Sequence, residues 1–196
     1  MPPVNILNVG YDSTNYYLIG TPAPKLLVDI GWPNTLPKFA HVLKRYNLQF
    51  KDIPYALATH YHPDHAGLAQ DLKQQGVKLI VMENQHEALA NFGRLMKPEN
   101  NYLPITLKNN IELRFSESRK FLAGLGLAGE IIATPGHSDD SVTLALDEGF
   151  AFTGDLHPMT FALEGQHERI DASWEKIRAL GGRTVYPGHG PVQKIR

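Results

Sequence analysis

One short segment of the chain is rich in side chains that bind metal ions. It spans residues 60–65 and reads His60-Tyr61-His62-Pro63-Asp64-His65. In an extended backbone, residues two apart point the same way, so His60 and His62 can reach one ion together. The chain should turn at Pro63, which places Asp64 and His65 poorly for that ion but well for a second one. The segment therefore predicts a site for two metal ions.

Three further ligand-type residues each follow a predicted strand and a glycine. They stand in Thr134-Pro135-Gly136-His137-Ser138, Phe152-Thr153-Gly154-Asp155-Leu156 and Tyr186-Pro187-Gly188-His189-Gly190. Strand ends at one edge of a sheet lie close together, so residues far apart in sequence can converge there. Asp155 has two carboxylate oxygens and is expected to bridge the two ions. The remaining ligands would be His60, His62 and His137 for the first ion and Asp64, His65 and His189 for the second.

Composition limits the kinds of protein that this chain can be. Its 196 residues are enough for a sizeable core, and we predict a single domain spanning residues 1–196. The net charge of −1 argues against nucleic acid or an anionic membrane as partner and leaves a small molecule. Because the chain has no cysteine, any metal must bind nitrogen and oxygen. Without an apolar run of about 20 residues or a signal-like start, we expect no membrane span and a cytoplasmic location.

Strand-like and helical patterns alternate along the chain, which predicts an α/β fold. Strands are expected at residues 4–9, 16–19, 25–30, 55–59, 78–82, 111–115, 130–134, 141–146, 150–153 and 183–186. Helices are expected from 34 or 35 to 46, from about 65 to 75, from 83 to 96, from 116 to 123, and from 171 or 173 to 180. Two irregular segments, 97–110 and 157–170, are expected to border the binding site.

The motif His-x-His-x-Asp-His, followed by a later His, Asp and His at strand ends, resembles the metallo-β-lactamase superfamily over nearly the whole chain. The resemblance implies an α/β fold of four layers, αββα, in which two mixed sheets lie face to face with helices outside. It also implies metals at one edge of this sandwich, held by the same ligands: His60, His62, Asp64, His65, His137, Asp155 and His189. Asp29, in Val28-Asp29-Ile30-Gly31, resembles a family aspartate that supports the site without binding metal.

Departures from particular branches of this family narrow the expected activity. Flavodiiron-type members carry Glu where His62 stands, and true β-lactamases are usually exported, with a cysteine ligand in one class. Glyoxalase II carries a C-terminal helical domain that binds glutathione, whereas seven residues follow His189 here. Nuclease branches with an added domain are longer, and their phosphate substrates require a basic surface. The resemblance therefore implies a compact hydrolase of a small ester, thioester or lactone.

The expected chemistry is hydrolysis by a metal-bridging hydroxide. Two divalent ions that share a water lower its pKa from near 16 toward about 7. Zinc is the first expectation, and iron and manganese suit the same ligands. Asp64 would orient the hydroxide, and His157 would donate a proton to the leaving group or contact substrate, unless it is a solvated loop residue. Tyr61 and Trp32 are candidates for the pocket wall, with packing as the alternative.

Two other functions are compatible with the same ligand types. One is an oxidoreductase resembling persulfide dioxygenases, in which two histidines and an aspartate hold a single iron. The other is a non-catalytic metal-binding module of the same fold. Any one of these residues alone would more often be a surface residue or a cap, but the complete set favours the hydrolase. The sequence specifies neither the substrate nor the oligomeric state.

Overall fold

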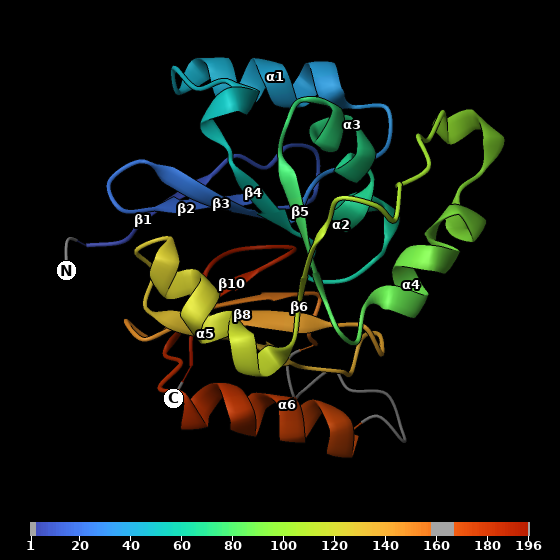
Figure 1. Ribbon diagram of the computed structural model, residues 1–196. Helices are drawn as coiled ribbons and strands as arrows, with labels where there is room; N and C mark the ends of the chain where they lie inside the picture. Colours follow the sequence, from blue (N-terminus) through green and yellow to red (C-terminus); the bar gives the residue numbers. More distant parts are fainter. Residues whose placement is uncertain (1–2, 158–166, 196) are drawn as a thin grey trace.

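The computed structural model describes residues 3–157 and 167–195. Its strands form two mixed sheets (Figure 1). The first sheet has the order β1-β2-β3-β4-β5-β6, with β1 (Asn5–Asn8), β2 (Tyr17–Gly20), β3 (Pro24–Val28), β4 (Tyr55–Leu57), β5 (Lys78–Met82) and β6 (Ile111–Leu113). The second has the order β11-β10-β9-β8-β7, with β7 (Gly129–Ala133), β8 (Val142–Leu146), β9 (Phe150–Gly154), β10 (Thr184–Pro187) and β11 (Gln193–Lys194). Strands β3 to β6 are parallel, as are β9 and β10, and the other described pairs are antiparallel.

The two sheets pack face to face because their strands carry apolar residues on both faces. In β3, Leu26 and Val28 belong to one buried cluster, whereas Leu27 between them belongs to another. The cluster of Leu26 and Val28 also contains Leu144 and Phe152 of the second sheet. This shared cluster is the core of the sandwich and fixes how the strand ends of the two sheets face each other.

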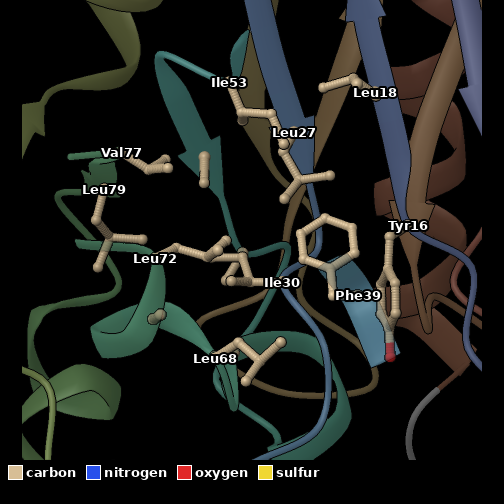
Figure 2. Packing of buried hydrophobic residues seen from close by; sticks show 14 of the residues in the cluster. Tyr16, Leu18, Leu27, Ile30, Phe39, Ile53, Leu68, Leu72, Val77 and Leu79 are labelled. Carbon is tan, nitrogen blue, oxygen red and sulfur yellow. The ribbon is translucent and has the colours of Figure 1, made fainter. Parts of the chain in front are cut away.

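Helices cover the outer face of each sheet. On the first sheet lie α1 (Leu36–Arg45) and α3 (Ala69–Gln74), and Figure 2 shows Phe39 of α1 in the buried cluster beneath them. The second sheet is covered by α6 (His167–Ala179), whose Trp174 packs in a third buried cluster. Figure 1 shows the resulting order of helix, sheet, sheet and helix. The four-layer αββα fold that the resemblance implies is confirmed.

The predicted helix at 65–75 is two helices, α2 (Pro63–Ala66) and α3, with Gly67 in the break between them. Helix α2 begins before the predicted start because proline suits the first turn of a helix. Gly67 keeps helical dihedrals, with φ −63° and ψ −29°, and the backbone departs from helical geometry at Leu68, with ψ 9°. A close contact requires glycine at position 67, since a Cβ atom there would lie 2.3 Å from the Cδ atom of Pro33.

Of the remaining elements, the predictions match α4 (His86–Asn91) and α5 (Phe115–Gly124) in type and the 3₁₀ helix η2 (Phe92–Leu95) approximately. The 3₁₀ helices η1 (Phe50–Asp52) and η3 (Pro98–Asn100) were not predicted. The predicted helix at 83–96 is thus α4 followed by η2, and strand β11 was not predicted. Among the described residues, no helix has both the length and the apolar character needed to cross a bilayer.

Helix α6 begins at His167, not at Asp171 or Ser173 as predicted. Ser173 does not cap the helix, because it is buried and its hydroxyl donates a hydrogen bond to the carbonyl of Pro135 at 2.7 Å. The apolar face that packs on the second sheet already starts at Ile170, so packing extends the helix beyond the predicted cap.

Replacing Leu43 with alanine tests the layer between α1 and the first sheet. Leu43 is buried in the cluster beneath α1, so Leu43→Ala should lower the free energy of unfolding by about 2–5 kcal/mol. Tyr46→Ala is the control, because Tyr46 is 41% exposed, and it should change this free energy by less than about 0.5 kcal/mol. Urea denaturation measures both variants, and equal stabilities would contradict the packing described.

Candidate metal centre

Ligand-type side chains converge where strands of both sheets end. The residues that follow β4, β7, β9 and β10 include His60, His137, Asp155 and His189. Nitrogen and carboxylate oxygen atoms of the described residues form three overlapping groups, each with its atoms within 4.8 Å of one another. The groups are His60, His62 and His137; His60, His65 and Asp155; and Asp64, His65 and His189. The structure thus brings together all seven residues that the sequence indicates as ligands.

The first group consists of three imidazoles. The chain leaves β4 in an extended form, and His62, with φ −102° and ψ 158°, directly precedes α2. The rings of His60 and His62 lie on the same side of this segment, with centroids 4.5 Å apart. The Nδ1 atom of His62 lies 3.0 Å from the Nε2 atom of His137. Three imidazoles at such spacings are a suitable donor set for one divalent cation.

The second group combines a carboxylate with two imidazoles. Asp64 and His65 lie in α2, and His189 lies on the turn after β10. The Oδ2 atom of Asp64 is 3.3 Å from Nε2 of His65 and 3.1 Å from Nε2 of His189. The turn at Pro63 therefore has the consequence that the sequence predicts, because it groups Asp64 and His65 with His189.

The carboxylate of Asp155 lies between the two groups. Its Oδ1 atom is 3.3 Å from Nε2 of His65, and its Oδ2 atom is 3.7 Å from Nε2 of His137. The Oδ2 atom is also 3.5 Å from Nε2 of His189. A carboxylate placed in this way can offer one oxygen to each of two ions, which is the geometry expected of a bridging ligand.

Two buried polar atoms show why a cation fits this centre. The Nε2 atom of His60 and the Oδ1 atom of Asp155 are shielded from water and have no hydrogen-bond partner among the described residues. A buried polar atom without a partner costs about 1–3 kcal/mol. Both are atom types that bind zinc and related metals, so a bound cation would satisfy them.

The carboxylates of Asp155 and Asp64 and the ring of His60 have ionisation states that suit a bound cation, whereas His65 has to release the proton on its Nε2 atom to bind one. Burial would raise the pKa of Asp155, but the positive charge of His65, whose Nε2 atom lies 3.3 Å from Oδ1, holds that pKa below its usual value. The pKa of Asp64 is held low in the same way, against the effect of burial. Burial, with the neighbouring imidazoles, lowers the pKa of His60 and keeps its ring neutral. Ionised carboxylates and neutral imidazoles are the protonation states that metal binding requires.

Asp29 supports His65 from behind, as the family resemblance implies. Its Oδ2 atom lies 2.9 Å from Nδ1 of His65, and its Oδ1 atom accepts hydrogen bonds from the backbone N–H and the hydroxyl of Thr59 at 2.8 Å each. Burial would lower the pKa of His65, but the charge of Asp29 and contacts with Asp155 and Asp64 raise it well above its usual value. A proton held on Nδ1 directs Nε2 toward the proposed metals.

Thr59 sets the orientation of His60. Its hydroxyl donates to Asp29 and also lies 3.2 Å from the Nδ1 atom of His60. Because the single hydroxyl hydrogen serves Asp29, this second contact requires His60 to donate its Nδ1–H. The lone pair of His60 is then on Nε2, which is the atom without a partner. The chain from Asp29 through Thr59 to His60 thus selects the tautomer that a metal needs.

The loop between β1 and β2 supports the second group, although the sequence analysis did not connect it with the site. The hydroxyl of Thr14 donates to Oδ2 of Asp64 at 3.2 Å. The carbonyl of Ser13 lies 2.7 Å from Nδ1 of His189 and accepts its N–H, which leaves the lone pair of Nε2 for a metal. These contacts join residues 50 and 176 positions apart, so no local spacing marks them.

Gln85 and Asp140 are a further pair of supporting residues, and no motif in the sequence marks them. Both are buried, and they hold the segment that carries His60. The carboxylate of Asp140 accepts the N–H of Tyr61 at 2.7 Å, and the side-chain amide of Gln85 donates to the carbonyl of Ala58 at 3.0 Å. A single sequence gives no sign that these two polar residues are buried.

Glycines let the turns after β9 and β10 approach the centre. A Cβ atom on Gly188 would lie 2.6 Å from both Oδ1 of Asp155 and Cε1 of His65, so close packing excludes a side chain there. Gly154 has a φ of +53°, and a Cβ atom on it would lie 2.2 Å from the Oγ1 atom of Thr59. Glycine is therefore required for steric reasons at both positions and, at Gly154, also for a conformational one.

A cavity of about 250 Å³ adjoins the centre, and Asp155, His157, Trp174 and His189 are among the residues that line it. The ring of His157 lies edge-on to that of His137, with centroids 5.4 Å apart. The carbonyl of His157 accepts a hydrogen bond from Nε1 of Trp174 at 2.9 Å. His157 is therefore beside the first group. Most of the segment 157–170 that was expected to shape the pocket, residues 158–166, lies outside the described residues.

Tyr61 does not contribute to the cavity wall. It is 2% exposed and packs edge-on against Phe92 in the cluster under the outer helices, with ring centroids 5.8 Å apart. Trp32 is partly exposed and is not among the described residues that line the cavity. The segment 97–110, expected to border the site, contacts α3, where Lys73 donates to two of its carbonyls.

Comparison with known proteins shows which family has this arrangement of sequence and fold. A sequence model described as the metallo-beta-lactamase superfamily matches residues 9–189. The chain belongs to this superfamily. It is 31% identical over 184 residues to the "Beta-lactamase-like protein 2 homolog" of Drosophila melanogaster, with 91% of this chain and 59% of that protein covered. It is 29% identical over 185 residues to the "Thioesterase pkgB" of Emericella nidulans, with 90% and 46% covered.

A solved structure, that of TTHA1623 in a di-iron-bound form, matches with a TM-score of 0.71 and 23% identity, covering 97% of this chain and 94% of that one. At this identity the likeness is one of fold. The chain spans about half to three-fifths of the length of the curated relatives reported above. The metallo-beta-lactamase fold and a metal-binding His and Asp cluster are therefore features of this superfamily member.

Asp29→Asn tests the support behind His65. Asparagine tolerates the positive φ of +64° at this position, so the backbone should be kept while the negative charge is lost. Affinity for the second metal should fall about 10- to 100-fold, as for other residues that orient metal ligands. Zinc titration against a chelating dye measures this.

The matched control for this test is Asp12→Asn. Asp12 also has a positive φ, of +56°, but its side chain is exposed and pairs with Lys38. It should leave both zinc affinities unchanged. If the two variants bound zinc equally well, Asp29 would have no supporting role.

Proposed function

We propose that the protein is a dinuclear metal-dependent hydrolase that cleaves a small ester, thioester or lactone with water activated at the metal centre. The observation that carries this proposal is the complete set of seven donor residues in three overlapping groups. His65 and Asp155 share one of these groups, so the donors of the two ions are contiguous. Membership of a superfamily of generally hydrolytic metalloenzymes supports the same reaction class.

Asp64 has the proposed role of orienting the attacking water. When bound, two divalent ions would lower the pKa of a shared water toward about 7 and polarise the substrate carbonyl. The Oδ2 atom of Asp64 is held by Thr14 at 3.2 Å and lies near Nε2 of both His65 and His189. Since its pKa is held low against burial by the neighbouring His65, Asp64 stays ionised and accepts a hydrogen bond from the water.

His157 has the proposed role of donating a proton to the leaving group or contacting substrate. It lines the cavity that Asp155 also lines, and its ring packs against His137. Imidazole exchanges a proton near neutral pH, which suits a general acid. The hydrogen bond from Trp174 to its carbonyl fixes the backbone at this point.

A small molecule is the proposed substrate, and neither nucleic acid nor a membrane is a proposed partner. The net charge of −1 provides no broad attraction for polyanions. The similarity to a protein named a thioesterase supports a thioester among the candidate bonds. Because the chain spans only part of the length of its relatives, their whole activities are not transferred to it.

Zinc is the proposed metal, with iron and manganese as the alternatives. All the donors are imidazole nitrogens and carboxylate oxygens, which suit each of these metals. A protein of similar fold was solved in a di-iron-bound form, which supports iron as an alternative metal. Metal analysis of the purified protein therefore belongs in any test of function.

Removal of single ligands tests the proposed function. Zinc-loaded protein should hydrolyse at least one member of a panel of esters, thioesters and lactones. His60→Ala and Asp155→Ala should lose metal, measured by elemental analysis, and lose activity by more than about 100-fold, since even supporting residues cost 10- to 100-fold. His41→Ala, at an exposed position of α1, is the control and should keep both.

Three results would contradict the proposal in different ways. Two metals and full turnover in Asp155→Ala would refute the bridging role. One redox-active iron per chain, with oxygen consumed in the presence of a persulfide, would replace the hydrolase with a persulfide dioxygenase-like enzyme. No activity on the whole panel, with metal fully loaded, would favour a non-catalytic module.

A further inference from the structure

The cavity beside the metal centre differs in chemistry from the centre itself. Leu156, Trp174 and Val185 line it and are only 5%, 6% and 3% exposed. All three belong to the buried cluster between α6 and the second sheet. The walls of the cavity are therefore mainly hydrocarbon, in contrast to the imidazoles and carboxylates next to it.

The cavity and the centre share residues. Asp155 and His189 line the cavity and also belong to the ligand groups. Leu156, the next residue after Asp155, is part of the apolar wall. A substrate whose scissile carbonyl lies at the centre can thus place a neighbouring group in the cavity without a change in the fold.

A second, polar cleft is formed by the loop between β1 and β2. This cleft has a volume of about 460 Å³ and is lined by residues that include Asp12, Ser13, Asn15 and Gly190. It touches the centre through Thr14, which lines the cleft and donates to Asp64. The metal centre therefore has a polar cleft and an apolar cavity as neighbours, and the two can hold different parts of one substrate.

The geometry points to the cavity as the binding site for an apolar chain of the substrate, with the indole of Trp174 as one of its walls. This inference rests on the proposed hydrolase function and specifies the substrate class as an ester, thioester or lactone with a hydrocarbon chain next to the scissile bond. Burial of apolar surface stabilises the complex in proportion to chain length. Specificity for chain length then follows from the size of the cavity.

Two series of straight-chain esters test the inference by kinetics, one with the chain on the acyl side and one with it on the alcohol side. In one of the series, kcat/KM should rise about fourfold for each added methylene until the chain fills the cavity. If kcat/KM does not change with chain length in either series, the inference is overturned.

Narrowing the entrance of the cavity provides a matched pair of variants. Gln193 lines the cavity and is exposed, so Gln193→Trp adds bulk there without disturbing the core. It should lower kcat/KM for the longest chains at least about tenfold and for acetyl or methyl esters less than twofold. Val192→Trp is the control, because Val192 is 49% exposed and is not among the described residues that line the cavity. Equal effects of both variants at every chain length would overturn the inference.

Fluorescence gives a readout that does not depend on turnover. The chain has two tryptophans, so Trp32→Phe leaves Trp174 as the single indole. Titration of the zinc-loaded variant with straight-chain alcohols and carboxylates should shift its emission to the blue with saturation, and affinity should rise with chain length. An emission spectrum that no chain length changes would overturn the inference.

The two readouts separate failure of the inference from failure of the proposed function. If no ester is hydrolysed but the Trp174 emission responds to chain length, the proposed function fails and the apolar cavity site stands. If short and long esters are hydrolysed equally well and the emission does not respond, the hydrolase function stands and the cavity site fails.

Discussion

A carboxylate oxygen shielded from water has to be met by positive charge or by hydrogen-bond donors, and at the half-buried Asp155, whose Oδ1 atom is shielded in this way, this constraint organises the rest of the centre. Burial alone would raise its pKa, but the adjacent His65 lowers it, so the group stays ionised. Its two oxygens lie within 3.7 Å of imidazole nitrogens of His65, His137 and His189. These histidines come from α2 and from two separate turns. A pair of cations at this point would satisfy the carboxylate and all of its neighbours together.

The sandwich meets this constraint by dividing the donors between its two sheets. The segment after β4, in the first sheet, supplies His60 and the residues that follow it, and the residue directly after β3 is Asp29, which lies behind them. The second sheet supplies His137, Asp155 and His189. The centre therefore exists only when the core between the sheets is packed correctly, which links the stability of the fold directly to metal binding and chemistry.

The convergence of the seven candidate ligands could be predicted from the sequence because their signals are local, whereas the residues that support them could not. Alternation in an extended segment places His60 and His62 on one side and, by the same rule, Tyr61 on the other, where it packs against Phe92. The ends of the helices depend on tertiary packing, as in α6, whose buried apolar face starts at Ile170, before the predicted cap at Asp171 or Ser173. The role of the β1–β2 loop depends on contacts across most of the chain.

X-ray diffraction from crystals grown with zinc, collected at the zinc absorption edge, tests the central claim most directly. The account predicts two anomalous peaks per chain, about 3.5–4 Å apart, with ligand distances of about 2.0–2.2 Å. One peak should lie among His60, His62 and His137, the other among Asp64, His65 and His189, with Asp155 contacting both. A single peak, or two peaks without Asp155 between them, would contradict a dinuclear centre bridged by this carboxylate.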